Sequence, residues 1–135
     1  MDREDLSNLG KIMLVCSDAC AEVEECLLAV GHRVVKVRDG NFAVVRARRE
    51  FFDTAVLVST GKAIDLAETF FALRDINESM NIIIIADWRD AIWNDMAQTI
   101  GTSGFAKTCV LTITELQEQL ASVETWRSRK IEPGH

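Results

Sequence analysis

Polar side chains that could bind a ligand follow the predicted strands of this chain. Aspartate carboxylates and a lysine can hold a metal ion or an anion, and serine and threonine hydroxyls can complete such a site. Because the carboxyl ends of parallel strands meet at one edge of a sheet, these residues would line one pocket there. The residues of this candidate pocket are Asp18, Ser59, Thr60, Asp87 and Lys107. The alternative, which we favour, is that strand ends are ordinarily polar and that Asp18 caps a helix.

The spacing of apolar residues predicts five strands, each followed by a helix. Continuous apolar runs such as residues 82–86 indicate strands buried on both faces, and helical spacing follows each run. In the second helix, Phe42 and Val45 are expected to face inward. Strict alternation predicts an α/β fold of three layers, with helices on both faces of a parallel sheet. Five units favour the flavodoxin-like strand order 2-1-3-4-5. The predicted strands are 11–16, 33–37, 53–58, 81–86 and 104–110, and the predicted helices are 19–30, 41–49, 62–78, 89–100 and 112–127.

Length and charge restrict the function. The 135 residues suffice for one domain, predicted over residues 11–127 between a leader (1–10) and a tail (128–135). A net charge of −6 disfavours direct nucleic-acid binding. The longest apolar run is too short to cross a membrane, and the polar N-terminus is unlike a signal peptide. We therefore expect a cytoplasmic protein.

The four cysteines do not have the spacing of a metal or redox motif. They are Cys16, Cys20, Cys26 and Cys109, and no pair is separated by two residues. We expect them to be reduced thiols that behave as small apolar side chains. No metal or cofactor is predicted.

Four short motifs resemble those of one signalling family. The first motif is Gly31-His-Arg-Val-Val35 followed by Asp39-Gly40, and the second is Phe52-Asp53, which opens the third predicted strand. The third is Leu73-Arg74, late in the third predicted helix. The fourth is Gly101-Thr-Ser-Gly-Phe105, which leads into the fifth predicted strand. In order and mutual spacing they resemble the response-regulator receiver (CheY-like) family over about residues 11–125. The resemblance implies a two-component signalling domain with the flavodoxin-like fold.

The resemblance also implies where the family's phosphorylation chemistry would lie. The phosphoacceptor aspartate usually follows the aspartate that opens the third strand by five residues, which gives Val58. Valine has no nucleophile, so it cannot accept a phosphoryl group. The family's acidic pair maps to Cys16 and Ser17, which carry no carboxylate. Its switch hydroxyl residue maps to Ala86 and its lysine to Thr108, which are of the wrong type as well. These degenerate positions are Cys16, Ser17, Val58, Ala86 and Thr108.

These substitutions predict a pseudo-receiver that is not an enzyme and acts by protein–protein contact. Its partner would be a signalling protein or an output module, or a second copy. The expected interface is the face of the fourth helix, fifth strand and fifth helix, with Trp88, Trp93 and Phe105. Burial of Trp93 in the core is the equal alternative, and Phe105 is expected to be a fixed packing residue. Two other functions stay open: a receiver phosphorylated at Ser59 with Asp18 on the metal, and a small-ligand-binding flavodoxin-like module.

Overall fold

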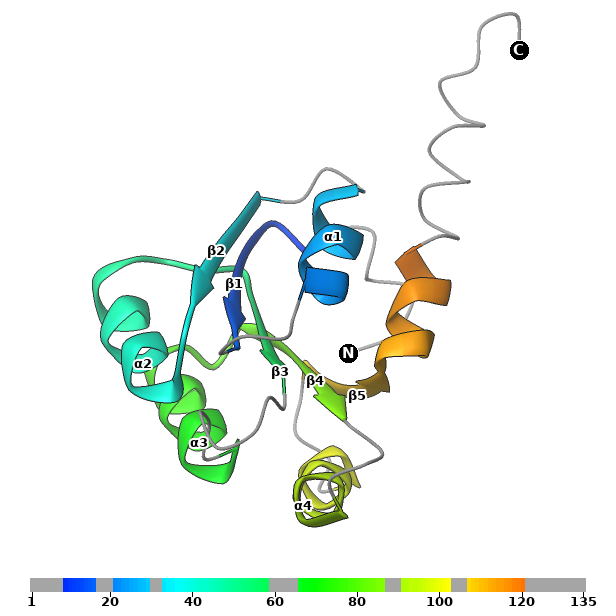
Figure 1. The fold of residues 1–135 in the computed structure, drawn as a ribbon. Coiled ribbons are helices and arrows are strands. Elements are labelled where there is room, and N and C mark those ends of the chain that lie inside the picture. The colour runs from blue at the N-terminus through cyan, green and yellow to red at the C-terminus, as the bar shows by residue number, and fades with distance from the viewer. Residues whose placement is uncertain are drawn as a thin grey trace, which may run out of the picture.

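Five strands form one parallel sheet in the computed structural model. The structure describes residues 9–16, 21–29, 33–58, 66–86, 91–102 and 107–120, with the backbone alone at 86, 91–94 and 101–102. The sheet order is β2-β1-β3-β4-β5 (Figure 1). This order confirms the flavodoxin-like topology expected from the sequence. The strands are β1 (Lys11–Val15), β2 (Arg33–Val37), β3 (Thr54–Val58), β4 (Asn81–Ala86) and β5 (Thr108–Thr112).

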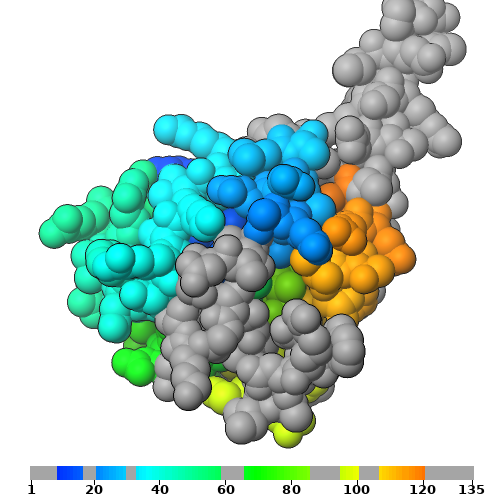
Figure 2. All heavy atoms as spheres, viewed as in Figure 1, coloured from blue at the N-terminus to red at the C-terminus, as the bar shows by residue number. Residues whose placement is uncertain are grey.

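Helices cover both faces of the sheet. One apolar cluster joins the sheet to α2, α3 and α4, and a second joins it to α1 and the helical segment 113–120. Successive residues of a strand alternate between the two clusters: Met13 belongs to the first, and Ile12 and Leu14 belong to the second. In Figure 2, α1 and segment 113–120 lie side by side on the surface. The labelled helices are α1 (Ala21–Ala29), α2 (Gly40–Arg49), α3 (Leu66–Ile76) and α4 (Ala91–Thr102).

Asp53 aligns the amino ends of three neighbouring strands. Its carboxylate accepts a hydrogen bond from the Lys11 amide at 2.8 Å, its amide donates to the Lys11 carbonyl, and its own carbonyl accepts from the Asn81 amide. Next to it, the buried Thr54 hydroxyl donates to the Leu9 carbonyl at 2.6 Å. Leu9 is fully buried, so the end of the predicted leader is part of the core. These bonds set the register of β1, β3 and β4.

Arg74 connects the end of α3 to the start of β5. Its guanidinium stacks on Phe70 and donates to the carbonyls of Met80 and Lys107 and to the Thr108 hydroxyl, the last two at 2.8 Å. Burial lowers the pKa of Arg74 from its usual value. Lys107 has a φ of 56°, and the strand begins directly after it. β5 is therefore Thr108–Thr112, displaced toward the C-terminus from the predicted strand 104–110.

Helix α2 presents a different face to the core from the one predicted. Phe42 and Val45, expected to face inward, are 47% and 46% exposed. The buried side of α2 instead carries Gly40, Ala43 and Ala47. The physical reason is the close approach of α2 to α3: a Cβ atom at Gly40 would overlap the Thr69 hydroxyl oxygen. Only small residues fit at this helix–helix contact, so the large apolar side chains lie outside.

The contact between Gly40 and Thr69 predicts a substitution whose effect depends on its background. Gly40→Ala should lower the free energy of unfolding by about 1–3 kcal/mol, because the added methyl group displaces α3. In a Thr69→Ala background the cost should vanish, since the oxygen that it meets is gone and alanine favours the helix. Urea denaturation followed by circular dichroism measures all four proteins. Equal costs in the two backgrounds would contradict this packing.

Candidate functional site

Three of the predicted phosphorylation-site positions lie together at the carboxyl edge of the sheet. Cys16 directly follows β1, and its amide donates to the Val37 carbonyl at 3.0 Å. Val58 ends β3 and pairs with Ile85, while Ala86 ends β4 and pairs with Thr112. Cys16, Val58 and Ala86 therefore lie at one edge of the sheet.

The side chains of Cys16 and Val58 belong to the apolar core. Cys16 is fully buried and Val58 is 6% exposed, and both join Ile85 in the cluster beneath α1 and segment 113–120. Neither side chain carries a carboxylate, so neither supplies the oxygen ligands that Mg²⁺ requires. A buried charge here would lose its hydration without gaining a partner among these apolar groups. Val58, the position that the resemblance assigns to the phosphoacceptor, is therefore part of the apolar packing.

Thr108 and Lys107 do not join this edge, which corrects their predicted placement. Thr108 is the first residue of β5 and pairs with Ile82, and the Lys107 carbonyl accepts from the Ile82 amide at 2.8 Å. Both residues therefore lie at the amino edge, where Arg74 holds them. The prediction rested on a fifth strand at residues 104–110, whereas the observed strand starts after the turn at Lys107.

Thr112 is the residue that β5 contributes to the carboxyl edge, and the site prediction omitted it. The Glu115 amide donates to the Thr112 hydroxyl and the Thr112 amide donates to the Glu115 carboxylate, both at 3.1 Å. This reciprocal pair is a capping box, in which Thr112 and Glu115 each accept from the other's amide. Because such a box stands where a strand ends and a helix begins, it was the signal in the sequence that could have located the end of β5.

The other predicted site residues lie outside the described residues. They are Ser17, Asp18, Ser59, Thr60, Asp87, Trp88 and Phe105, together with the side chain of Trp93. Within the described ranges, no group of three histidine, cysteine, aspartate or glutamate side chains could hold a metal ion.

Cys16 takes part in a disulfide, which corrects the expectation of four reduced thiols. Cys26 and Cys109 are reduced thiols, as expected. Burial raises the pKa of the Cys26 thiol, and the carboxylates of Glu22 and Glu25 act in the same direction. The Cys26 thiol is therefore protonated and weakly nucleophilic near neutral pH.

Comparisons with known proteins support the fold. No family model matches the sequence, and the comparison with curated proteins gave no match. Among solved structures, the model resembles the beryllofluoride-activated receiver domain of nitrogen regulatory protein C, with a TM-score of 0.59 and 18% identity over 91% of this chain and 98% of that one. It also resembles a CheY-like receiver domain protein from Methanospirillum hungatei, with a TM-score of 0.57 and 14% identity over 87% of this chain and 98% of that one.

A third similar structure bears on the metal. It is the receiver domain of a sensor histidine kinase from Pseudomonas aeruginosa, with a magnesium ion in its active-site cleft; its TM-score is 0.58 and its identity 22%, over 84% of this chain and 96% of that one. The chain therefore has the fold of response-regulator receiver domains. At the corresponding edge its described residues, Cys16, Val58 and Ala86, do not fit a magnesium ion.

Restoring a carboxylate at the end of β3 should destabilise the protein. Val58→Asp should lower the free energy of unfolding by about 2–5 kcal/mol at pH 7, because the ionised group is buried among apolar side chains. Desolvation should raise the pKa of the new aspartate above its unfolded value. Its cost should then shrink as pH falls, because the neutral form is easier to bury.

Val58→Ala is the matched control, because it removes packing without adding a charge. Its cost should not change between pH 7 and pH 4.5 relative to the unsubstituted protein. Thermal unfolding at the two pH values gives both measurements. A Val58→Asp protein as stable at pH 7 as the unsubstituted chain would contradict the apolar environment of this position.

The disulfide at Cys16 predicts the number of thiols that can be alkylated. Iodoacetamide under denaturing, non-reducing conditions should modify Cys26 and Cys109 but not Cys16, and after reduction it should modify Cys16 as well. Intact-protein mass spectrometry counts the additions, and peptide mapping locates them. Four additions without prior reduction would show that Cys16 is a thiol.

Proposed function

We propose that this chain is a phosphorylation-independent receiver-like signalling domain that acts by protein–protein contact. The observation that carries the proposal is the burial of Cys16 and Val58 in the apolar cluster beneath α1. Phosphotransfer to a receiver needs a carboxylate and a magnesium site at this edge, and apolar side chains supply neither. A receiver scaffold without that chemistry retains its surfaces, so binding is the function that remains.

The proposal includes no catalytic step and no cofactor. The described helices include none that is long and apolar enough to cross a membrane. We propose a cytoplasmic location, which is usual for a regulator of this kind. The disulfide at Cys16 stands against that location, because disulfides are rare in reducing compartments. Alkylation of the thiols in intact cells before lysis would decide the point.

We place the partner contact, or a homodimer contact, on the face formed by α4, β5 and segment 113–120. β5 is the last strand in the sheet order and has β4 as its one neighbour. Its residues Thr108, Cys109 and Val110 are only partly buried. An edge strand with partly exposed apolar residues is a suitable surface for association. Trp93 of α4, together with Trp88 and Phe105, would supply aromatic contacts on this face.

The proposal predicts that phosphoryl donors leave the protein unchanged. After incubation with acetyl phosphate and Mg²⁺, the intact mass should show no added phosphate, because Val58 offers no nucleophile. Beryllofluoride with Mg²⁺ should not raise the melting temperature. The receiver domain of nitrogen regulatory protein C, which beryllofluoride activates, is the positive control for the second experiment.

A phosphorylated species would overturn the proposal. Peptide mapping would then locate the modified residue, and Ser59→Ala and Asp18→Asn would test the atypical-receiver alternative. A melting temperature raised by a small molecule, without phosphorylation, would favour the ligand-binding alternative instead.

A further inference from the structure

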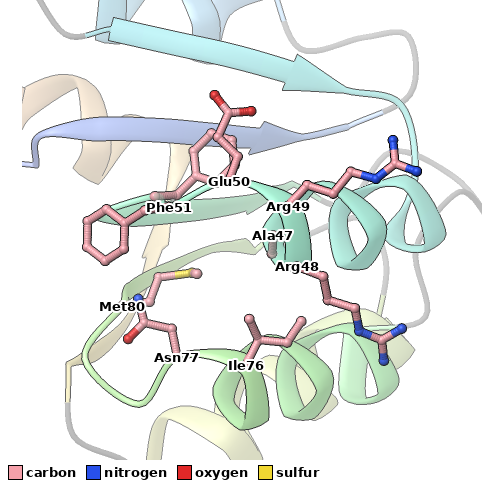
Figure 3. Close-up of a pocket in the computed structure, with 9 residues that line it drawn as sticks. Ala47, Arg48, Arg49, Glu50, Phe51, Ile76, Asn77 and Met80 are labelled. Atoms are coloured by element: carbon pink, nitrogen blue, oxygen red, sulfur yellow. The ribbon is translucent and has the colours of Figure 1, made fainter.

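A groove opens at the amino edge of the sheet, at the opposite end from the degenerate phosphorylation site. It lies between the end of α2 and the end of α3 and has a volume of about 470 Å³. In Figure 3, Phe51 and Met80 stand at one end of the hollow and Arg48 at the other. Its apolar lining includes Ala47 and Ile76. The groove therefore combines an apolar surface with a basic side.

The basic character of this region contrasts with the acidity of the whole chain. Residues 33–53 carry six basic and three acidic side chains, whereas the formal net charge of the chain is −6. The three acidic groups have partners within the fold: Asp39 caps α2, Asp53 binds the Lys11 amide, and Glu50 binds Lys11 and Arg46. The hydrogen bond from Lys11, followed by that from Arg46, lowers the pKa of Glu50. The acidic side chains here are thus already bonded.

Arg48 and Arg49, which line the groove, have no such partner. Both are exposed, and among the residues that the structure describes neither forms a hydrogen bond or an ion pair. On the side of α3, Asp75 and Glu78 are exposed but are not lining residues. Glu50 also lines the groove, but its carboxylate is paired with Lys11 and Arg46. The charge left for a bound group by the lining residues is therefore positive.

Exposed apolar residues continue the groove along α2. Phe42, Val45 and Arg49 are spaced by three and four positions, so they share one face of the helix. Arg38 stacks on the Phe42 ring at 4.6 Å. Phe51, the residue at the mouth of the groove, is 67% exposed. Aromatic and arginine side chains exposed together are typical of the residues that dominate binding at protein interfaces.

We propose that this groove binds an acidic segment of a partner protein, which inserts an apolar side chain beside Phe51 and places carboxylates against Arg48 and Arg49. The inference rests on the proposed function, action by protein contact, and it adds a second surface with a partner of defined chemistry. A nucleic acid fits less well, because an extended polyanion would meet the acidic remainder of the molecule.

A labelled peptide tests the groove directly. The probe is a fluorescein-labelled ten-residue peptide of aspartate and glutamate with a central leucine–phenylalanine pair. Fluorescence anisotropy at low and physiological salt should show saturable binding that weakens as salt rises. A peptide of the same charge with the apolar pair replaced by glycine should bind about tenfold more weakly.

Matched variants separate the groove from general electrostatic attraction. Arg48→Glu should weaken binding about tenfold, whereas Lys36→Glu, the same charge change on β2, should alter it less than twofold. Phe51→Ser should also weaken binding about tenfold, whereas Leu28→Ser removes an apolar side chain that is 53% exposed on α1 and should have no effect. All four sites are exposed, so folding is expected to persist, and circular dichroism checks it.

Several outcomes would overturn the inference. One is the absence of saturable peptide binding, and another is an equal loss of peptide affinity in the groove variants and in their controls. A third is tighter binding of a single-stranded oligonucleotide than of the peptide at the same residues. Concentration-dependent association that Arg48→Glu abolishes would assign the groove to a second copy of the chain. The phosphorylation experiment and the peptide experiment test different proposals. Failure of peptide binding would contradict the groove but not the phosphorylation-independent function, whereas a phosphorylated protein would contradict that function but not the groove.

Discussion

The fold depends on the alignment of β1, β3 and β4 at their amino ends, which Asp53 sets. One residue bonds the backbones of both neighbouring strands, and Thr54 adds a buried bond to Leu9. In a parallel sheet, a slip of one residue would turn every side chain to the opposite face and separate the two apolar clusters from their helices. The same alignment brings Cys16, Val58 and Ala86 to one edge, where receiver chemistry would take place. The scaffold and the location of its site are therefore consequences of one set of hydrogen bonds, and those bonds do not require the site to be active.

The strands that are buried on both faces were predictable from the sequence, because short continuous apolar runs such as residues 82–86 are typical of central parallel strands. The strand order followed from the alternation of strands with helices. The inward face of α2 was not predictable in the same way. Hydrophobicity alone favoured Phe42 and Val45, whereas the observed contact is limited by the distance between α2 and α3, which admits only small side chains such as Gly40. The information needed lies in a partner helix some 30 positions further along the chain.

The sequence located the ends of the central strands better than it located the edge strand β5, because the register of a central strand is set by two neighbours. Val58 and Ala86 end central strands whose register is set on both sides, so spacing along the sequence located them correctly. β5 has a neighbour on one side only, and its start depends on the long-range bonds of Arg74 to Lys107 and Thr108. The apolar pattern that predicted a strand at residues 104–110 could not include those bonds. The disulfide at Cys16 was missed because the sequence offers no recognised motif for it.

The two ends of the sheet differ in what they offer a ligand. At the carboxyl edge, the described side chains of Cys16 and Val58 lie within the apolar core. At the amino edge, Arg48, Arg49 and Phe51 are exposed, although burying Phe51 would stabilise the fold. The proposed function assigns no phosphate-driven switch to the first edge, because Cys16 and Val58 supply no carboxylate there. The groove proposed at the second edge offers basic and aromatic side chains that face solvent. Under these two proposals, the lost phosphotransfer chemistry and the recognition of a partner belong to opposite ends of the same strands.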